Sequence, residues 1–502
     1  MGTVTAGLTR TMTRLPEQLR KSLTWDRGME LADHKNVTID TGLAVYFADP
    51  RSPRQRGTNE NTNRLLRQLD PRLGRWRTVS AVAETEAIAS GMGPATWWKL
   101  PRTYGVWLVG SLVSQLGDAA LYFALGWSAS AVGGSAAGLV LSAIVLPRTV
   151  LLLVGGVVGD RAGARRVMIA GDAVMLVVAA TLGVVAYRWG TPLPLLVVAG
   201  LVIGTVDAFY LPSLGSMPRR LVEDGQLSRA VAVRQSGSQL ITMIGGPVGG
   251  AVVVVAGFAA AAWADAVTFA VVLAVLVAIR PRFDAPAPGP AESVLRSAGD
   301  GFRVVVRTPG LGPALLLVAG AAGFIIPSTS LLVPLLARDN HWNAGTAGVI
   351  VGAQGVGVIA ATLFVTRRGA SRRPGIAAAL GLGGAAVGQV LLGILHLPPP
   401  AIAAAVLIGA GTGTFVSNLG PVLLGTAPRT HLSRVQALVS VVQASALLVT
   451  NNVLGAIAHL FSAPTALMCC AGGVAGCAVI ALGTPTLRAL GVRSAPAQSV
   501  AA

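Results

Sequence analysis

The chain has 502 residues, of which 53% are hydrophobic and only 12% are charged, and its formal net charge is +18. Soluble globular proteins have about twice that share of charged residues, so the composition argues against a wholly soluble fold. A basic net charge also occurs in proteins that bind nucleic acids. Here, however, most arginines stand in short clusters between apolar segments, an arrangement typical of membrane topology.

Several other functions are disfavoured by what the sequence contains. Cys469, Cys470 and Cys477 all fall in the last apolar segment, so we expect neither a disulfide framework nor a metal site. Residues 1–30 lack the apolar core of a secretory signal peptide. The G-x-x-x-x-G-K-S/T loop of nucleotide-binding proteins does not occur, which argues against direct ATP-driven activity. We expect no cofactor.

The first part of the chain, residues 14–68, has the mixed composition of soluble sequence. It resembles the C-terminal half of the catalytic domain of insertion sequence 30 family transposases, although Arg54 replaces the family's usual Trp. The resemblance is carried by the segments SLTWDRGME (22–30), VYFADP (45–50), which we expect to form a strand, and SPRQRGTNENTNRLLRQ (52–68).

The resemblance implies a catalytic site in which three carboxylates hold two metal ions for strand transfer. Mg²⁺ prefers such hard oxygen ligands. Asp26 and Glu60 match the second and third carboxylate, with 33 residues between them, but the first Asp is missing. We therefore expect residues 1–70 to be an inactive, incomplete ribonuclease-H-like α/β fragment joined by gene fusion, followed by a linker at 71–100. A purpose-built regulatory domain is the alternative, but about 70 residues with few apolar side chains form a poor core.

From Tyr104 onwards the chain is mostly apolar, and twelve segments are long enough to cross a bilayer core of about 30 Å as helices. They are expected at 104–127, 136–158, 167–187, 193–214, 236–256, 260–279, 311–336, 346–365, 375–397, 401–424, 437–461 and 464–482. The polar, Pro-rich break at 281–310 is expected to be a cytoplasmic linker ending in a short amphipathic helix. It divides the spans into bundles of six at 101–280 and 311–485, and we expect 486–502 to be a disordered tail.

Arginine placement predicts the orientation of these spans. With the N-terminus inside, the inner loops hold eighteen arginines and the outer loops hold two, Arg188 and Arg338. A shift by one span would remove this asymmetry. We therefore expect a multi-pass protein of the cell membrane with both termini in the cytoplasm.

The two bundles also resemble each other in sequence. Three pairs of segments recur at offsets of 207, 207 and 205 residues: DRAGARR (from 160) with RRGASRR (from 367), Gly204-Thr205 with Gly411-Thr412, and LSRAVAV (from 227) with LSRVQAL (from 432). Paired six-span repeats of this kind are found in several transporter folds.

The loop GGVVGDRAGARR at 155–166, between the second and third spans, points to a family. Its residues Gly156, Asp160, Arg161, Gly163, Arg165 and Arg166 match the G-x-x-x-D-R-x-G-R-R loop of the major facilitator superfamily of transporters, with Ala164 as the one departure. The resemblance implies an all-α fold of twelve membrane helices in two related bundles. It also implies that this loop latches the two halves on the cytoplasmic side, although inside-positive topology alone could explain its arginines.

Longer segments narrow the resemblance to one branch of that superfamily, across about residues 100–485. They include LVSQLGDAAL in the first span, FYLPSLGSMPRRLVEDGQLSRA after the fourth and VPLLARDNHWNAGTAGVIVGAQGVG across the seventh and eighth. Together they resemble macrolide-efflux and enterobactin-exporter proteins. Proton-driven antiport of a drug or siderophore is what this resemblance implies.

Ionisable residues at membrane depth are costly and therefore candidates for function. The sequence offers Asp118 in the first span, Arg148 in the second, Asp207 in the fourth and Asp265 near the outer end of the sixth. We expect Arg148 to pair with Asp118 or Asp207, and one of these carboxylates to be the protonation switch; a static pair that only holds spans together is the alternative. Asp265 could instead snorkel or cap a helix end.

Other polar and small residues have weaker claims. Asn418 could bind substrate, but an interhelical hydrogen bond explains it equally well. Gly246, Pro247 and Gly250 match an antiporter-like G-P-x-x-G pattern in the fifth span, or simply allow close helix packing.

The sequence thus predicts a monomeric secondary transporter with a small-molecule substrate, protons and the lipid bilayer as its partners, and no enzyme activity. Two alternatives stay open: a transposase-derived DNA-binding protein, whose catalytic set is incomplete, and a membrane sensor that does not transport.

Overall fold

The computed structural model describes residues 22–25, 44–47, 100–279, 283, 311–369, 371, 373–426 and 432–484. The chain forms two units, Met1–Thr96 and Trp97–Ala502, and each is considered by itself.

In the first unit, strands β1 (Ser22–Trp25) and β2 (Ala44–Phe47) pair in parallel, and β2 overlaps the segment expected to form a strand. β1 ends directly before Asp26. Asp26 and Glu60 themselves lie outside the described residues, as do the linker at 71–96 and the helix expected before residue 311.

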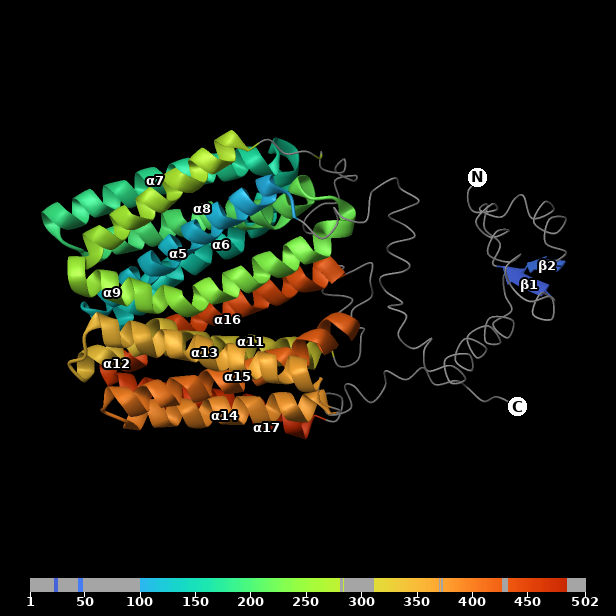
Figure 1. The fold of residues 1–502 in the computed structure, drawn as a ribbon. Helices are drawn as coiled ribbons and strands as arrows, with labels where there is room; N and C mark the ends of the chain where they lie inside the picture. Colours follow the sequence, from blue (N-terminus) through green and yellow to red (C-terminus); the bar gives the residue numbers. More distant parts are fainter. Residues whose placement is uncertain are drawn as a thin grey trace. The chain divides into compact units, whose positions relative to one another are not determined.

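The second unit is a bundle of long apolar helices (Figure 1). We call α5–α9 the first half and α11–α17 the second. The first half consists of α5 (Arg102–Ser130), α6 (Gly134–Ala162), α7 (Ala164–Trp189), α8 (Leu193–Leu221) and α9 (Asp224–Ala278). The second consists of α11 (Leu311–Pro327), the π-helical turn η4 (Ser328–Leu332), α12 (Val333–Asp339), α13 (Ala344–Arg368), α14 (Pro374–Ile394), α15 (Pro398–Thr426), α16 (Leu432–Leu460) and α17 (Ala463–Gly483).

In two places the helices and the membrane crossings do not correspond one to one. α9 is 55 residues long, about 80 Å at 1.5 Å per residue, which is far more than one crossing. It folds back at Gly257, whose φ of 77° and ψ of −177° are available to glycine but not to residues with a Cβ. α11, η4 and α12 form one crossing, in which Pro327 removes a backbone donor and the helix widens to a π turn.

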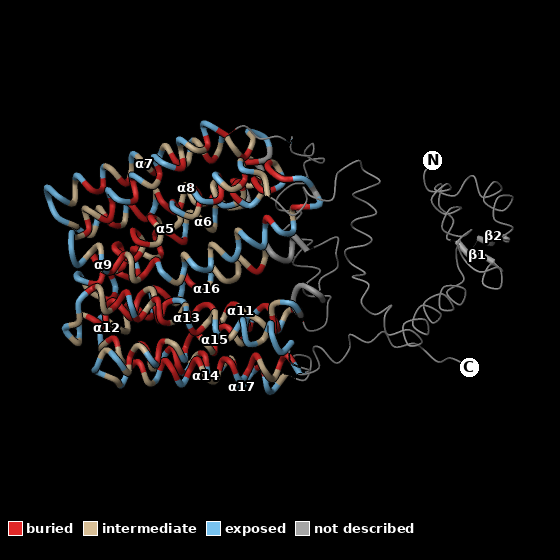
Figure 2. Tube along the Cα trace, viewed as in Figure 1, coloured by how far each residue is buried: buried red, intermediate tan, exposed pale blue. Residues whose placement is uncertain are grey.

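Eleven described helices or helix groups are long and apolar enough to cross a membrane, and α9 supplies two crossings. The twelve-span prediction is therefore confirmed. The burial pattern agrees with it, since buried residues gather along the inner faces of the helices and exposed ones along the outside (Figure 2). Many of the exposed residues are large and apolar, such as Val150, Val177 and Val255, which suits contact with lipid.

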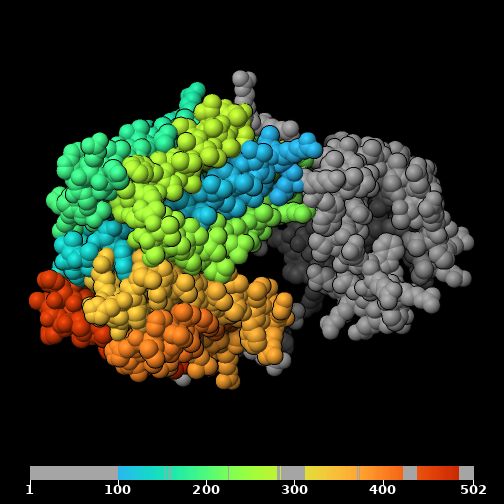
Figure 3. All heavy atoms as spheres, turned by 60° about the vertical axis from the view of Figure 1, so that its left-hand side comes forward, coloured from blue at the N-terminus to red at the C-terminus, as the bar shows by residue number. Residues whose placement is uncertain are grey.

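The two halves share one packing scheme, as the sequence repeats predicted. In the first, α5 packs on α9, α6 on α8 and α7 on α9; in the second, α11 packs on α16, α13 on α15 and α14 on α17. Gly163 between α6 and α7 and Gly369 between α13 and α14 both have positive φ, 89° and 82°. The two halves form adjoining blocks (Figure 3).

The halves contact each other closely at the end of the bundle where α5 ends and α6 begins, at the left of Figure 1; we call it the far end and the opposite one the near end. There Arg338 of α12 donates from Nε to Ser130 Oγ and from Nη2 to the Trp127 carbonyl, both at 2.7 Å. Its guanidinium also lies 4.3 Å from the centre of the Trp127 ring. A Cβ on Gly455 of α16 would lie 2.6 Å from the carbonyl oxygen of Gly134 at the start of α6, so these two backbones touch.

Candidate functional site

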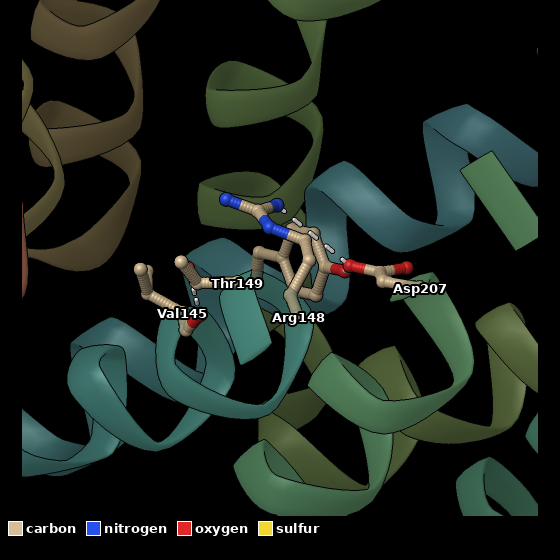
Figure 4. A network of polar contacts seen from close by, with 5 residues as sticks. Val145, Arg148, Thr149 and Asp207 are labelled. Carbon is tan, nitrogen blue, oxygen red and sulfur yellow. Dashed lines mark hydrogen bonds and ion pairs between the residues drawn. The ribbon is translucent and has the colours of Figure 1, made fainter. Parts of the chain in front are cut away.

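An arginine–aspartate pair links α6 and α8 inside the first half. Arg148 Nη1 lies 3.8 Å from Asp207 Oδ2, and Tyr122 of α5 donates its hydroxyl to the same oxygen at 2.8 Å. The guanidinium is turned towards Asp207 (Figure 4). The Arg148 and Asp207 side chains are 32% and 20% exposed, so a molecule entering between the helices can reach both charges. Of the two partners the sequence left open for Arg148, the structure shows Asp207.

Close contact between the α6 and α8 backbones sets this geometry. A Cβ on Gly204 would collide with the carbonyl of Ile144, and a Cβ on Gly155 would collide with the carbonyl of Ala208. Only glycine allows the two helices to approach so closely, and the approach brings the charged pair within reach across the helix interface.

Asp265 lies at the interface of α9 and α5, close to Asp118. Its side chain is fully buried, so the expectation that it snorkels or caps a helix end is wrong. Thr268 donates to Asp265 Oδ1 at 3.2 Å, and Oδ2 has no hydrogen-bond partner among the described residues. A Cβ on Gly117 would collide with this carboxylate, so α5 packs directly on it. Asp118 is an electrostatic neighbour of Asp265.

Sequence reasoning missed a fourth carboxylate, Asp172 of α7. Its side chain is fully buried, and neither carboxylate oxygen has a well-formed hydrogen bond to any described residue. The Tyr210 hydroxyl of α8 lies beside it. The criterion that selected Asp118 would have found Asp172 as well, because Asp172 also interrupts an apolar span.

A cavity of about 390 Å³ lies between the two halves, beside the charged pair. Arg148, Thr149 and Leu211 line it from the first half, and α11 and α16 line it from the second through residues that include Ile326 and Gln443. A second cavity of about 340 Å³ shares Ile326 and Gln443 and is lined mainly by apolar side chains of α11, α15 and α16. The cavity between the halves thus carries a charge on its first-half side, and it adjoins a mostly apolar cavity within the second half.

A larger cavity, about 520 Å³, lies among α6, α7 and α8. Its lining is almost entirely apolar, and Thr205 is its single residue with a polar side chain. Because it offers no charge and is lined by one half alone, we do not assign the site to it.

Asn418, a predicted substrate ligand, uses its side chain elsewhere. Its Oδ1 accepts from the Ser371 backbone at 3.2 Å and its Nδ2 donates to the Thr414 carbonyl at 2.9 Å. The side chain is 3% exposed and lines neither the cavity between the halves nor the apolar cavity beside it. These contacts fit the alternative in which Asn418 forms structural hydrogen bonds.

The glycine–arginine segment at 155–166, expected as a loop, is helical except at Gly163, since it forms the end of α6 and the start of α7, and it contacts the first half itself. Arg165 donates to the carbonyls of Leu276 and Val277 at the end of α9, at 2.9 and 3.0 Å. A cation there also complements the negative end of the helix dipole. Arg161 and Arg166 are exposed, and the Asp160 side chain lies outside what the structure describes. The contact seen for this loop therefore braces one half, and a latch between the halves stays a prediction.

The G-P-x-x-G segment of α9 packs against α13, across the boundary between the halves. A Cβ on Gly246 would lie 3.2 Å from the Gly348 carbonyl, and one on Gly250 would lie 2.5 Å from the Ala344 carbonyl. Pro247 fills the space beside Gly352. These small residues let two helices that belong to different halves meet backbone to backbone.

No three histidine, cysteine, aspartate or glutamate side chains converge on a metal-sized site in the part of the chain that the structure describes. Among the described residues, the structure shows a charged pair facing a cavity between two helical halves, and two further carboxylates, Asp172 and Asp265, that are fully buried in the first half. A cavity between two six-span halves with ionisable groups beside it is the arrangement found in membrane transporters.

The comparisons with known proteins agree with this class. The family model described as Major Facilitator Superfamily matches residues 107–450. The chain belongs to this superfamily.

Among curated proteins, macrolide efflux protein A of Streptococcus pyogenes is 28% identical over 246 residues, which are 48% of this chain and 60% of that protein. The N-terminal region is similar to the transposase InsI of insertion sequence element IS30A from Escherichia coli K12, with 62% identity over 69 residues, or 14% of this chain and 18% of the transposase. The chain thus spans less than two thirds of each of these relatives.

Solved structures confirm the fold. A point mutant of the nucleoside transporter NupG has a TM-score of 0.61 at 12% identity, covering 76% of this chain and 99% of its own. A bacterial homologue of the human lysosomal transporter Spinster, in an inward-facing and unoccupied conformation, also has a TM-score of 0.61 at 12% identity. This match covers 80% of the present chain and 98% of the homologue.

Proposed function

We propose that the protein is a proton-driven exporter of a bulky amphiphilic small molecule, drug-like or siderophore-like. The observation that carries this proposal is the Arg148–Asp207 pair on the wall of the cavity between the halves. The adjoining cavity in the second half is mostly apolar, so the two together suit a molecule with a large apolar body and one polar or charged group. Macrolide efflux protein A, a relative by sequence, supports this class of substrate.

The arginine clusters support an orientation with the near end in the cytoplasm. The contacts of Arg338, Gly134 and Gly455 then close the bundle on the outside. In this conformation the cavity receives substrate from the cytoplasmic side. Export requires these far-end contacts to break and the halves to rock about the cavity, as alternating access demands.

Proton coupling is assigned to the carboxylates of the first half. When Asp207 is charged, it holds the Arg148 guanidinium and accepts the Tyr122 hydroxyl. A proton on Asp207 neutralises it, which removes the Coulomb attraction and frees Arg148 to turn into the cavity. Asp118 is the second candidate for this switch, and its charge lies near those of Asp207 and Asp265.

Transport in proteoliposomes tests the proposal, with radiolabelled erythromycin as the probe. An acid lumen should drive accumulation as protons leave, and an ionophore that collapses the gradient should abolish it. The Asp118→Asn, Asp207→Asn double variant should retain exchange of labelled for unlabelled erythromycin while losing gradient-driven accumulation. Undiminished coupling in this variant would refute the assignment to these carboxylates. No uptake by the unaltered protein would refute export of this substrate class.

A further inference from the structure

We propose that Asp172 is a second proton-binding residue and that the Tyr210 hydroxyl links it to the Asp207 pair. It would let protons reach the pair from the near end of the bundle through the interior of the first half, so that they need not cross the substrate cavity. This deepens the proposed coupling mechanism and rests on it, but Asp172's proton can be observed without any transport measurement.

The burial of Asp172 makes a bare charge there implausible. The side chain is fully enclosed by protein, and neither oxygen has a well-formed hydrogen bond within the described structure. A carboxylate in such surroundings loses its hydration, and the Tyr210 hydroxyl beside it compensates for only part of that loss, whereas the protonated acid carries no charge to hydrate. A shared metal ion would be the other way to neutralise the buried carboxylates, but no three potential ligands converge among the described residues.

Tyr210 is placed to connect Asp172 with the pair. A Cβ on Gly171 would lie 3.1 Å from Tyr210 Cδ2, so the tyrosine ring packs on α7 directly beside Asp172. Its hydroxyl has Asp172, Asp118 and Asp207 as electrostatic neighbours. A phenol can accept a proton on its oxygen while it gives up its own, so it relays a proton without a net change of charge.

The depths of these groups rise in order from the near end. Asp172 stands eight residues after the start of α7, or about 12 Å along the helix. Tyr210 and Asp207 stand eleven and fourteen residues before the end of α8, or about 16 and 21 Å. Asp172 does not line the cavity between the halves, whose first-half lining is Arg148, Thr149, Leu152 and Leu211.

Other charged or titratable groups lie on the helices of the first half, around Asp172 and Tyr210. On α5, Asp118 is the electrostatic neighbour of Asp172, and on α9, Asp265 is a neighbour of Asp118. On α6, Arg148 pairs with Asp207. On α7 itself, Arg165 near the start of the helix is engaged with the end of α9.

Infrared spectroscopy of the purified full-length protein in a maltoside detergent tests the first part. A protonated carboxylic acid has a carbonyl stretching band that a carboxylate lacks, and it shifts in D₂O. Asp172→Asn, which is isosteric, should remove one such band at neutral pH. Asp207→Asn is the matched control and should remove none, because Asp207 is paired with Arg148. Equal bands in Asp172→Asn and the unaltered protein would overturn the proposal, and so would the absence of any such band in the unaltered protein, which needs no variant to fold.

Exchange kinetics test the link through Tyr210. After transfer to D₂O, the time course of the band shift reports how fast the proton on Asp172 exchanges. Tyr210→Phe keeps the ring and removes the hydroxyl, so it should slow this exchange by about tenfold or more. An unchanged rate would show that Tyr210 is not the relay. Neither measurement uses a substrate, so failure of erythromycin transport would bear on the proposed function and not on this inference.

Discussion

At the scale of single residues, the site depends on how one carboxylate is held. Asp207 Oδ2 receives both the Arg148 guanidinium and the Tyr122 hydroxyl, which come from two other helices. A proton on Asp207 weakens both contacts, because both are strengthened by its negative charge. The Tyr122 hydroxyl therefore helps to decide how readily Asp207 exchanges its arginine for a proton.

Tyr122→Phe tests this role because it removes only the hydroxyl. A hydrogen bond to a charged group contributes about 1.5–3 kcal/mol, which we reduce to about 1–2 kcal/mol because the pair is partly exposed. We expect gradient-driven erythromycin uptake to fall about five- to thirtyfold while exchange of labelled for unlabelled substrate persists. Tyr187→Phe is the matched control, since Tyr187 is 72% exposed near the far end of α7. Equal rates in the two variants would contradict the role given to Tyr122.

The sequence identified Arg148 and Asp207 from their depth in the membrane. Depth alone also explains why it misjudged Asp265. Counting residues along a span gives depth, and depth made Asp118 and Asp207 the two candidate partners of Arg148. Counting does not show which side of a helix a neighbour covers. Asp265 therefore looked like a residue at a helix end, although α5 packs over it at Gly117. Asp172 was overlooked although it also interrupts an apolar span, and only the structure shows that its side chain is fully buried.

At the scale of elements, hydropathy and arginine clusters predicted every membrane crossing of the bundle. What they did not predict is how crossings join, because this depends on backbone angles at a few positions. The fifth and sixth crossings were expected at 236–256 and 260–279, and the chain does reverse direction between these ranges, but it does so at the single residue Gly257 and without a loop. No atom lies within 4 Å of a Cβ built there, so a substitution would be opposed by backbone conformation alone.

Gly257→Ala isolates that conformational cost. A residue with a Cβ at φ 77° and ψ −177° is strained by about 1–3 kcal/mol. We expect the Tm of the purified protein to fall by about 2–6 °C. Gly105→Ala is the matched control, because Gly105 also has open space around it but lies in regular helix, where alanine is favoured by up to about 1 kcal/mol. A Tm of Gly257→Ala at or above that of Gly105→Ala would show that the reversal needs no glycine.

At the scale of the whole molecule, two six-span halves meet across a cavity and are joined at the far end. The contacts there differ in kind. Small residues such as Gly134 and Gly455 bring backbones together, whereas Arg338 forms directional bonds to Ser130 and Trp127. Close packing resists lateral separation of the helices, and the arginine adds bonds that must all break when the far end opens. The balance between conformations should therefore respond to Arg338 more than to any other charge at this end.

Arg338→Gln should shift the equilibrium towards conformations open at the far end. Charge-assisted hydrogen bonds contribute about 1.5–3 kcal/mol each, so losing them should change the ratio of conformations by about tenfold or more. In a variant with Cys469, Cys470 and Cys477 replaced, spin labels at Val132 of the first half and His341 of the second report the far-end separation by double electron–electron resonance.

The expected result is a longer population in the distance distribution of Arg338→Gln. Arg188→Gln should leave the distribution unchanged, because Arg188 lies in the last turn of α7 at the same end and is exposed. A distribution for Arg338→Gln that matches this control would mean that the helix packing alone closes the far end. Alternating access in this protein would then have to be controlled elsewhere, at the charged pair or at the loops of the near end.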